Sequence, residues 1–98
     1  MIIEKALITV DRGEEQAFEQ AFFEAAPFIA SSPGCHGVHL YDCVEEPTRF
    51  MFVIEWESLA AHEEGFRRAP ASAEWRKIVG PYLGGLSELA HYRPIDKP

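Results

Sequence analysis

The sequence has 98 residues, 47% of them hydrophobic and 12% aromatic, with a formal net charge of −7. This length suits a single domain, residues 1–98, that buries roughly two-thirds of the surface of its unfolded chain. The acidic balance argues against nucleic acid and anionic membrane surfaces as partners, because both repel a negative surface. Neither a run of about 18 apolar residues nor a basic, cleavable leader occurs, which argues against a membrane span and against export. We therefore expect a cytoplasmic protein in which Cys35 and Cys43 are reduced thiols.

The first half of the chain begins with a predicted strand and helix. Residues 2–10 are apolar at odd and even positions alike, interrupted by Glu4 and Lys5, which is typical of a central strand. Pro27 lies inside the helical pattern that follows and predicts that the helix is kinked there or ends just before it. That helix is predicted over residues 14–30 from the spacing of Phe18, Phe22, Ala25 and Ile29.

Two strands are predicted next. Residues 37–44 alternate between apolar and polar side chains, which is typical of an edge strand. The polar connection 45–48 is short enough to join this strand to the next one as an antiparallel hairpin. Residues 50–57 are apolar on both faces and predict a second central strand.

A broken helical region and a final strand complete the chain. Ser58 is a predicted N-cap, because its hydroxyl can accept a hydrogen bond from a free amide of the first turn. The helix after it directs Leu59, His62, Phe66 and Ala69 inward at three- and four-residue spacing. Pro70 interrupts it, and a second helical piece is predicted from about Ser72 to Leu83. Residues 86–92 form the last predicted strand.

The resulting order is β-α-β-β-α-β, in which each half is a strand, a helix and a returning strand. It predicts an α+β fold, a ferredoxin-like sandwich with both helices on one face of an antiparallel four-stranded sheet. The strands at 2–10 and 50–57 are apolar on two faces, yet the helices can cover only one. Because soluble monomers rarely expose an apolar sheet face, we expect a homodimer that packs through it.

Three stretches resemble a known family. The run PGCHGV at 33–38 is similar to a segment that leads into the family's second strand. The run FVIEWES at 52–58, continued by Ala61, His62 and Phe66, is similar to its pattern W-x-S-x-x-A-H-x-x-x-F. Trp75 and residues 90–92 extend the resemblance over nearly the whole chain. The family is the antibiotic biosynthesis monooxygenase (ABM) domain, and the resemblance implies a dimeric α+β barrel.

Relatives of this domain include cofactor-free oxygenases of polyketide quinone-forming pathways, haem-degrading enzymes and an isomerase. The resemblance therefore implies a monooxygenase with no cofactor, whose electron-rich phenol or quinol substrate reduces dioxygen itself. The sequence also lacks a flavin, nicotinamide or metal-binding motif. It departs from the haem-degrading branch, which uses an asparagine on the first strand and a histidine late in the second helical region. This sequence has no asparagine, and Trp75 lies near the place of that histidine.

His62 is the candidate catalytic residue. On an inward helix face it can act as a general base or as a hydrogen-bond donor near neutral pH. The alternative is a partly buried histidine that only satisfies a backbone carbonyl. Aromatic side chains form either a flat substrate pocket around it or simply the core. These candidate substrate-binding residues are Trp56, Phe66, Trp75, Phe22 and Tyr82.

Cys35, His39 and Cys43 carry side chains that can bind metal, and they would share one face of an extended strand. Positions four apart on a strand are separated by roughly 13 Å. Zinc ligands lie within about 2.3 Å of one ion, so a straight strand cannot bring these three together. We therefore expect no metal site among them.

The leading hypothesis from the sequence is a homodimeric, cofactor-independent monooxygenase of a small aromatic or quinol-like metabolite. Two alternatives remain open. One is a non-catalytic module that binds a small ligand in the same pocket. The other is an isomerase of a small metabolite that uses His62 for proton transfer.

Overall fold

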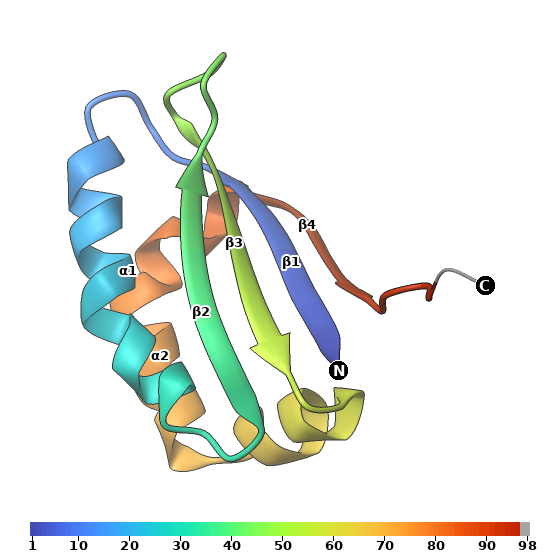
Figure 1. The fold of residues 1–98 in the computed structure, drawn as a ribbon. Helices are drawn as coiled ribbons and strands as arrows, with labels where there is room; N and C mark the ends of the chain where they lie inside the picture. Colours follow the sequence, from blue (N-terminus) through green and yellow to red (C-terminus); the bar gives the residue numbers. More distant parts are fainter. Residues whose placement is uncertain (97–98) are drawn as a thin grey trace.

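The computed structural model describes residues 1–96, so the last two residues of the predicted domain 1–98 lie outside the described part. The chain forms a single sheet with helices on one side of it (Figure 1). The elements in order are β1 (Ile2–Thr9), α1 (Glu15–Ala30), β2 (Cys35–Asp42), β3 (Arg49–Trp56), the π-helical segment η1 (Ala61–Phe66), α2 (Pro70–Val79), the 3-10 segment η2 (Gly80–Gly85) and β4 (Leu86–Tyr92).

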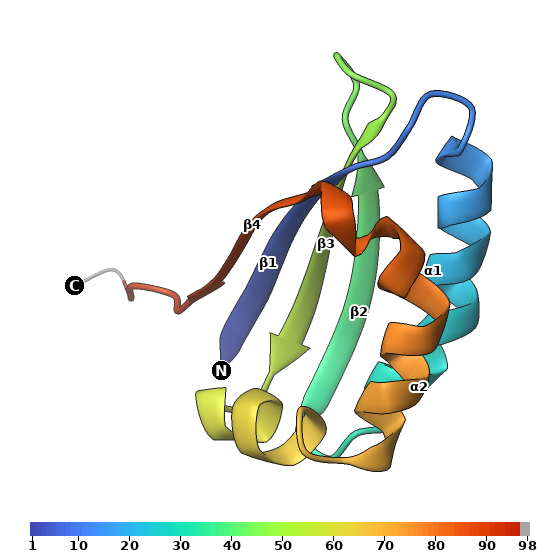
Figure 2. The ribbon, with the colours of Figure 1, turned by 180° about the vertical axis from the view of Figure 1, so that it is seen from behind.

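The four strands lie in the order β2-β3-β1-β4, and every neighbouring pair is antiparallel. Helices α1 and α2 cover the same face, mainly over β2 and β3, while β1 and β4 extend beyond them (Figure 2). This arrangement confirms the predicted ferredoxin-like α+β fold, with β1 and β3 as the central strands. No helix among residues 1–96 is long and apolar enough to cross a bilayer.

The core lies between the sheet and the two helices. The even-numbered side chains of β1 and β3 point into it, because alternate residues of a strand face opposite sides. They meet the inward stripe of α1 and the buried positions of α2. Core residues with no more than 8% exposure are Ala6, Ile8, Val10, Phe18, Phe22, Ala25, Ile29, Phe50, Phe52, Ile54, Trp56, Phe66, Trp75 and Val79.

Helix α1 continues through Pro27 to Ala30. This corrects the alternative in which the helix ends just before Pro27. The proline ring removes one backbone donor, so the carbonyl of Phe23 loses its helical partner. Pro27 and Phe23 both lie on the exposed side of the helix, where water can hydrate that carbonyl. The inward stripe is therefore undisturbed.

The region after β3 also differs from the prediction. In place of an ordinary helix there is a short π-helical segment, and Leu59, predicted to point inward, is 45% exposed. His62 and Phe66 are buried as predicted. Helix α2 begins at Pro70 rather than Ser72, because proline at a first helical position needs no amide hydrogen. It ends at Val79 because Gly80 and Pro81 continue as a 3-10 turn.

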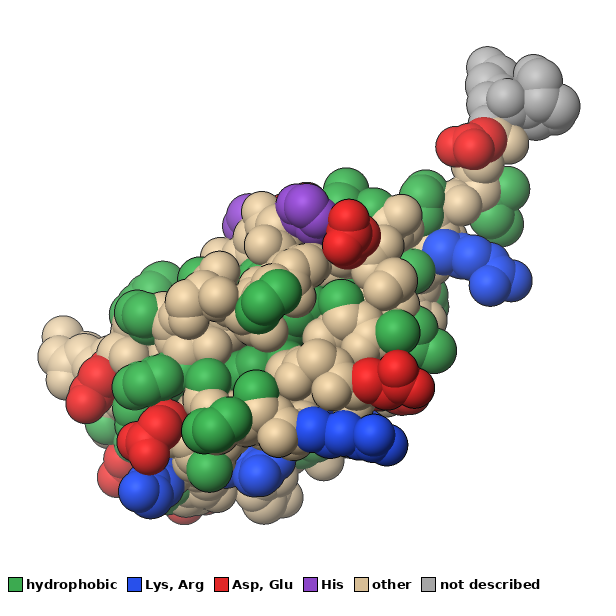
Figure 3. Space-filling view, turned by 90° about the horizontal axis from the view of Figure 1, so that it is seen from below, with side chains coloured by type: hydrophobic (Ala, Val, Ile, Leu, Met, Phe, Trp, Pro, Cys, Tyr) green, Lys and Arg blue, Asp and Glu red, His purple; other side chains and the backbone are tan. Residues whose placement is uncertain are grey.

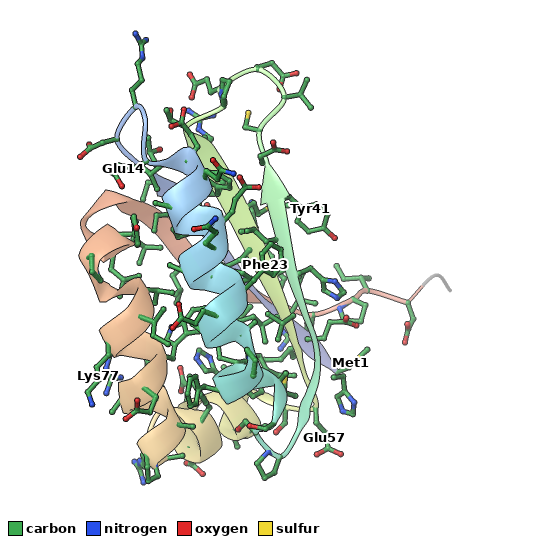
Figure 4. All side chains as sticks on the ribbon, turned by 90° about the vertical axis from the view of Figure 1, so that its left-hand side faces the viewer. Met1, Glu14, Phe23, Tyr41, Glu57 and Lys77 are labelled. Carbon is green, nitrogen blue, oxygen red and sulfur yellow. The ribbon has the colours of Figure 1, made fainter. Side chains whose placement is uncertain are left out.

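The face of the sheet away from the helices carries odd-numbered side chains. Ile3, Leu7, Met51 and Val53 are only partly buried there. Tyr41 is 50% exposed and points away from the helices (Figure 4). Two ion pairs, Lys5–Glu88 and His39–Glu55, also lie on this face, and Lys5 and His39 flank Val53 in the neighbouring strands. At the end of the molecule where η1 lies, acidic and basic side chains are interspersed with hydrophobic ones (Figure 3).

Candidate functional site

A carboxylate lies in the core face of the central strand β1. Glu4 has the same orientation as Ala6 and Ile8, and only 5% of its surface is exposed. Burial disfavours a charged carboxylate, and this desolvation raises the pKa of Glu4 despite the opposing effects of a hydrogen bond from Trp56 and the charge of Arg67. A carboxylic acid with a perturbed pKa in an otherwise apolar core face is a candidate functional group.

Trp56 supports this carboxylate from the end of β3. Its indole Nε1–H donates a hydrogen bond of 3.0 Å to Glu4 Oε1. The indole is fully buried, so the bond is protected from competing water. The ring of Trp56 also lies under the imidazole of His62, at a centroid distance of 5.1 Å and an interplanar angle of 12°.

The segment η1 brings His62 to this point. The amide of Ala61 donates to Ser58 Oγ at 3.1 Å, which satisfies one free donor at the start of the segment. The amide of Arg67 donates to the carbonyl of His62 at 3.0 Å, the wide turn of a π-helix. This turn leaves both His62 and Phe66 facing the sheet.

A second histidine completes the group. His91 lies directly opposite Glu4 in the antiparallel pair of β1 and β4. His91 Nε2 is 2.7 Å from His62 Nδ1, and His62 Nε2 is 3.4 Å from Glu4 Oε1. While Glu4 is ionised it can only accept, so His62 presents its Nε2–H to the carboxylate and Nδ1 accepts from His91.

His62 is neutral at physiological pH. Desolvation, followed by the charges of His91 and Arg67, lowers the pKa of His62 to about 4. A neutral imidazole retains one lone pair that can accept a proton or bind a metal ion. The lowered pKa makes His62 a weaker base than an exposed histidine, whereas the raised pKa of Glu4 makes its carboxylate a stronger base than an exposed one.

A cavity of about 160 Å³ opens beside Glu4 and His62. Its walls come from the sheet, η1, α2 and the inner side of β4, which α1 and α2 leave uncovered (Figure 2). Two arginines, Arg67 and Arg76, lie at its edge and are exposed. The remaining lining residues are Phe52, Phe66, Ser72, Trp75, Leu83, Leu86 and Leu89.

Only some of the six candidate residues from the sequence lie at the cavity. His62, Phe66 and Trp75 line the cavity. Trp56 lies beneath His62 and reaches the cavity only through its bond to Glu4. Phe22 packs in the core against Trp75, with ring centroids 5.5 Å apart. Tyr82 packs against Phe18 and lines a different hollow, near Thr9 and Glu14.

Sequence reasoning did not assign Glu4, His91, Arg67 or Arg76 to the site. Glu4 carried a usable signal, because it is a charged residue at an inward position of an otherwise apolar strand. His91 carried none, since its closeness to Glu4 depends on which strands are neighbours. The two arginines are exposed residues of a helical region, where basic side chains are ordinary.

The comparisons with known proteins agree with this fold. The profile described as antibiotic biosynthesis monooxygenase (ABM) matches residues 1–78. The chain belongs to the ABM family. Its Bacillus subtilis relative YczJ, an uncharacterised protein, is 33% identical over 95 residues, covering 97% of this chain and 100% of YczJ.

Solved structures of ABM proteins superpose closely on this one. A protein of Bordetella bronchiseptica, provisionally assigned as an antibiotic biosynthesis monooxygenase, has a TM-score of 0.83 at 35% identity, with 96% of each chain covered. A variant of SnoaB, a cofactor-independent oxygenase of Streptomyces nogalater, has a TM-score of 0.81 at 16% identity, covering 98% of this chain and 94% of SnoaB. At that identity, the likeness to SnoaB shows a shared ABM fold alone.

Proposed function

We propose that this ABM protein is a cofactor-independent monooxygenase of a small aromatic or quinol-like metabolite. The observation that carries the proposal is the cavity whose floor contains the paired Glu4 and His62 and whose walls are aromatic and aliphatic. Family membership and the fold shared with the cofactor-independent oxygenase SnoaB support the same assignment.

The chemistry requires a base and a dry pocket. Once its hydroxyl is deprotonated, an electron-rich phenol can pass an electron to dioxygen, and the radical pair then combines to a hydroperoxide. For a hydroquinone with a free ring C–H, loss of water from that hydroperoxide gives the hydroxylated quinone (C₆H₆O₂ + O₂ → C₆H₄O₃ + H₂O for the parent compound). For a hydroxy-anthrone it converts the ring CH₂ into a carbonyl. One oxygen atom enters the product and the other leaves as water. The four electrons come from the substrate, so the reaction balances without an external reductant.

Glu4 and His62 would act together as the base. The proton from the substrate hydroxyl is accepted by this pair, and His91 holds the His62 ring through Nδ1. The positive charge of Arg67 acts to lower the pKa of both Glu4 and His62. The same charge would stabilise the substrate oxyanion. Phe66 and Trp75 offer flat surfaces for the aromatic ring.

The cavity size favours a one-ring substrate. A cavity of about 150 Å³ in another protein core is large enough for benzene, and this one measures about 160 Å³. A polycyclic substrate would have to extend past the exposed side chains of Leu86 and Leu89. We therefore place substituted hydroquinones ahead of anthrones as substrates.

Oxygen-electrode measurements over a panel of hydroquinones, catechols and hydroxy-anthrones test the proposal. We expect protein-dependent oxygen uptake that falls at least about a hundredfold in His62→Ala, because a positioned base typically contributes that much. The matched control is His36→Ala, which removes an exposed histidine of β2 that does not line the cavity. Substrate conversion without oxygen uptake would indicate the isomerase instead, and equal rates in the two variants would remove His62 from the mechanism.

We propose in addition that the protein is a homodimer joined through the outer face of its sheet. The partly buried Ile3, Leu7, Met51 and Val53 lie on this face of neighbouring strands β1 and β3, with Leu7 directly opposite Met51, Val53 opposite Lys5 and Ile3 opposite Glu55. Apolar areas of several hundred Å² are uncommon on soluble monomers, so a second copy of the chain is the natural cover. The candidate cavity opens on the other face and remains accessible in this arrangement.

A further inference from the structure

We propose that Glu4, His62 and His91 together bind one divalent transition-metal ion. Each residue offers one ligand atom, and these three atoms lie within 4.8 Å of one another. The ligands come from β1, η1 and β4, so the folded chain brings them together without any ion. Two imidazoles and one carboxylate are a donor set that transition metals use in proteins.

One ion can bind only one nitrogen of His62, and Nε2 is the nitrogen that lies beside Glu4. Two ligands on one tetrahedral ion with bonds of about 2.1 Å are separated by roughly 3.4 Å. His62 Nε2 and Glu4 Oε1 are already 3.4 Å apart. His91 Nε2 is bonded to the other nitrogen, His62 Nδ1, at 2.7 Å, so His91 would have to break that hydrogen bond and swing toward Nε2 to join the ion. His91 lies on an edge strand and is half-buried, which leaves it room to move.

The surroundings of the three ligands are those of a built site. Trp56 donates a hydrogen bond to the Glu4 carboxylate, as outer groups commonly do for a ligating carboxylate. The same indole lies flat beneath the His62 ring and fixes its plane. The adjoining cavity leaves space for a water molecule or small ligand at the fourth position of the ion, as in catalytic rather than structural metal sites.

The ligand types select among metals. Imidazole nitrogens suit Zn²⁺, Co²⁺, Ni²⁺ and Fe²⁺, whereas Ca²⁺ and Mg²⁺ require a mainly oxygen shell. Glu4 supplies a negative charge to the ion, whereas Arg67 and Arg76 at the edge of the cavity oppose a cation, so the affinity has to come from the three ligands. A bound ion would occupy the lone pairs that the proposed base requires, so Zn²⁺ binding at this site would inhibit the oxygen uptake proposed above.

Direct metal binding tests the proposal independently of any oxygenase activity. The protein without a histidine tag is titrated with Zn²⁺ by calorimetry and with Co²⁺ by visible absorption, with Mg²⁺ as the comparison ion. We expect one Zn²⁺ or Co²⁺ per chain, a d–d spectrum typical of low coordination number, and no binding of Mg²⁺. His91→Ala and Glu4→Gln should each weaken binding by at least about tenfold.

The control variant is His39→Ala, which removes an exposed histidine paired with Glu55 and should bind metal as the unaltered chain does. Circular dichroism establishes that each variant is folded before it is titrated. Absence of saturable Zn²⁺ and Co²⁺ binding by the folded, unaltered chain would overturn the proposal. So would equal affinity in His91→Ala and the unaltered chain, because binding would then occur elsewhere on the surface.

Discussion

The imidazole of His62 lies flat on the indole of Trp56, with an angle of 12° between the ring planes. The stacking fixes the plane of the His62 ring, and its two nitrogens are thereby directed at Glu4 on one side and His91 on the other. Trp56 also bonds to Glu4, so one buried residue positions both members of the proposed base. Its substitution is the most informative structural test of the site.

Trp56→Phe removes the donor to Glu4 while retaining an aromatic ring under His62. We expect a loss of about 1–3 kcal/mol in the free energy of unfolding, because a buried carboxylate loses its hydrogen bond. Urea denaturation measures it. The loss should shrink on acidification, as Glu4 becomes protonated and needs the donor less. Trp75→Phe is the control, since Trp75 lies in the cavity wall. A loss of unfolding free energy in Trp56→Phe that does not change with pH would contradict the expectation.

The stability of the protein should fall as the pH decreases from 6.5 to about 4. In that window the unfolded chain takes up a proton on His62, whose pKa is lowered to about 4 in the folded state. Folding stability therefore rises with pH there, by up to ~3 kcal/mol for this residue. Denaturation of His62→Phe at several pH values should show a correspondingly flatter profile. An unchanged profile would show that His62 does not titrate between these limits.

Glu4 has the opposite effect on the pH dependence of folding stability. Its pKa is raised on folding, so the folded state binds a proton more readily and gains stability as the pH falls through that pKa. Glu4→Gln removes this compensation, and we expect its stability to fall more steeply with acid than that of the unaltered chain. Thermal unfolding over the same pH range measures the difference. A shallower fall would refute the assignment of a raised pKa to Glu4.

Gly85, at the end of η2, lies against the end of β1. A Cβ atom there would collide with the backbone carbonyl of Thr9, which cannot move without disturbing β1. We expect Gly85→Ala to destabilise the protein by at least about 2 kcal/mol. Gly84→Ala is the matched control, because a Cβ atom at position 84 meets nothing within 4 Å. Equal denaturation midpoints for the two variants would disprove this account.

Val53→Asp tests the proposed dimer. The charge would be buried in the proposed interface between Lys5 and His39, which are already paired with Glu88 and Glu55, so the added carboxylate is costly there. Analytical ultracentrifugation at micromolar concentration should show a dimer for the unaltered chain and its loss in this variant. Val44→Asp is the control, since Val44 is 90% exposed in the turn after β2. A folded 11.1 kDa species for the unaltered chain would end the proposal.

Local patterns were sufficient to predict most elements. Strands β1, β3 and β4 were placed within a residue or two, because the two-residue period and the turn residues around them are read directly from the chain. The alternative that the helix ends just before Pro27 was wrong, because sequence alone does not show whether a lost hydrogen bond faces solvent. The π-helical segment was missed because its wider turn has almost the same spacing of apolar residues as an ordinary helix.

The sequence by itself determined the fold class, the two central strands and the inward direction of His62, since each depends on periodicity within a short stretch. Only the tertiary structure decided which residues surround His62. His91 is 29 positions away and Trp56 is 52 positions from the carboxylate it supports. These residues meet because β1 pairs with both β3 and β4, which places Glu4 between Ile54 and His91 in the sheet. Strand pairing is a long-range property, and no local period encodes it.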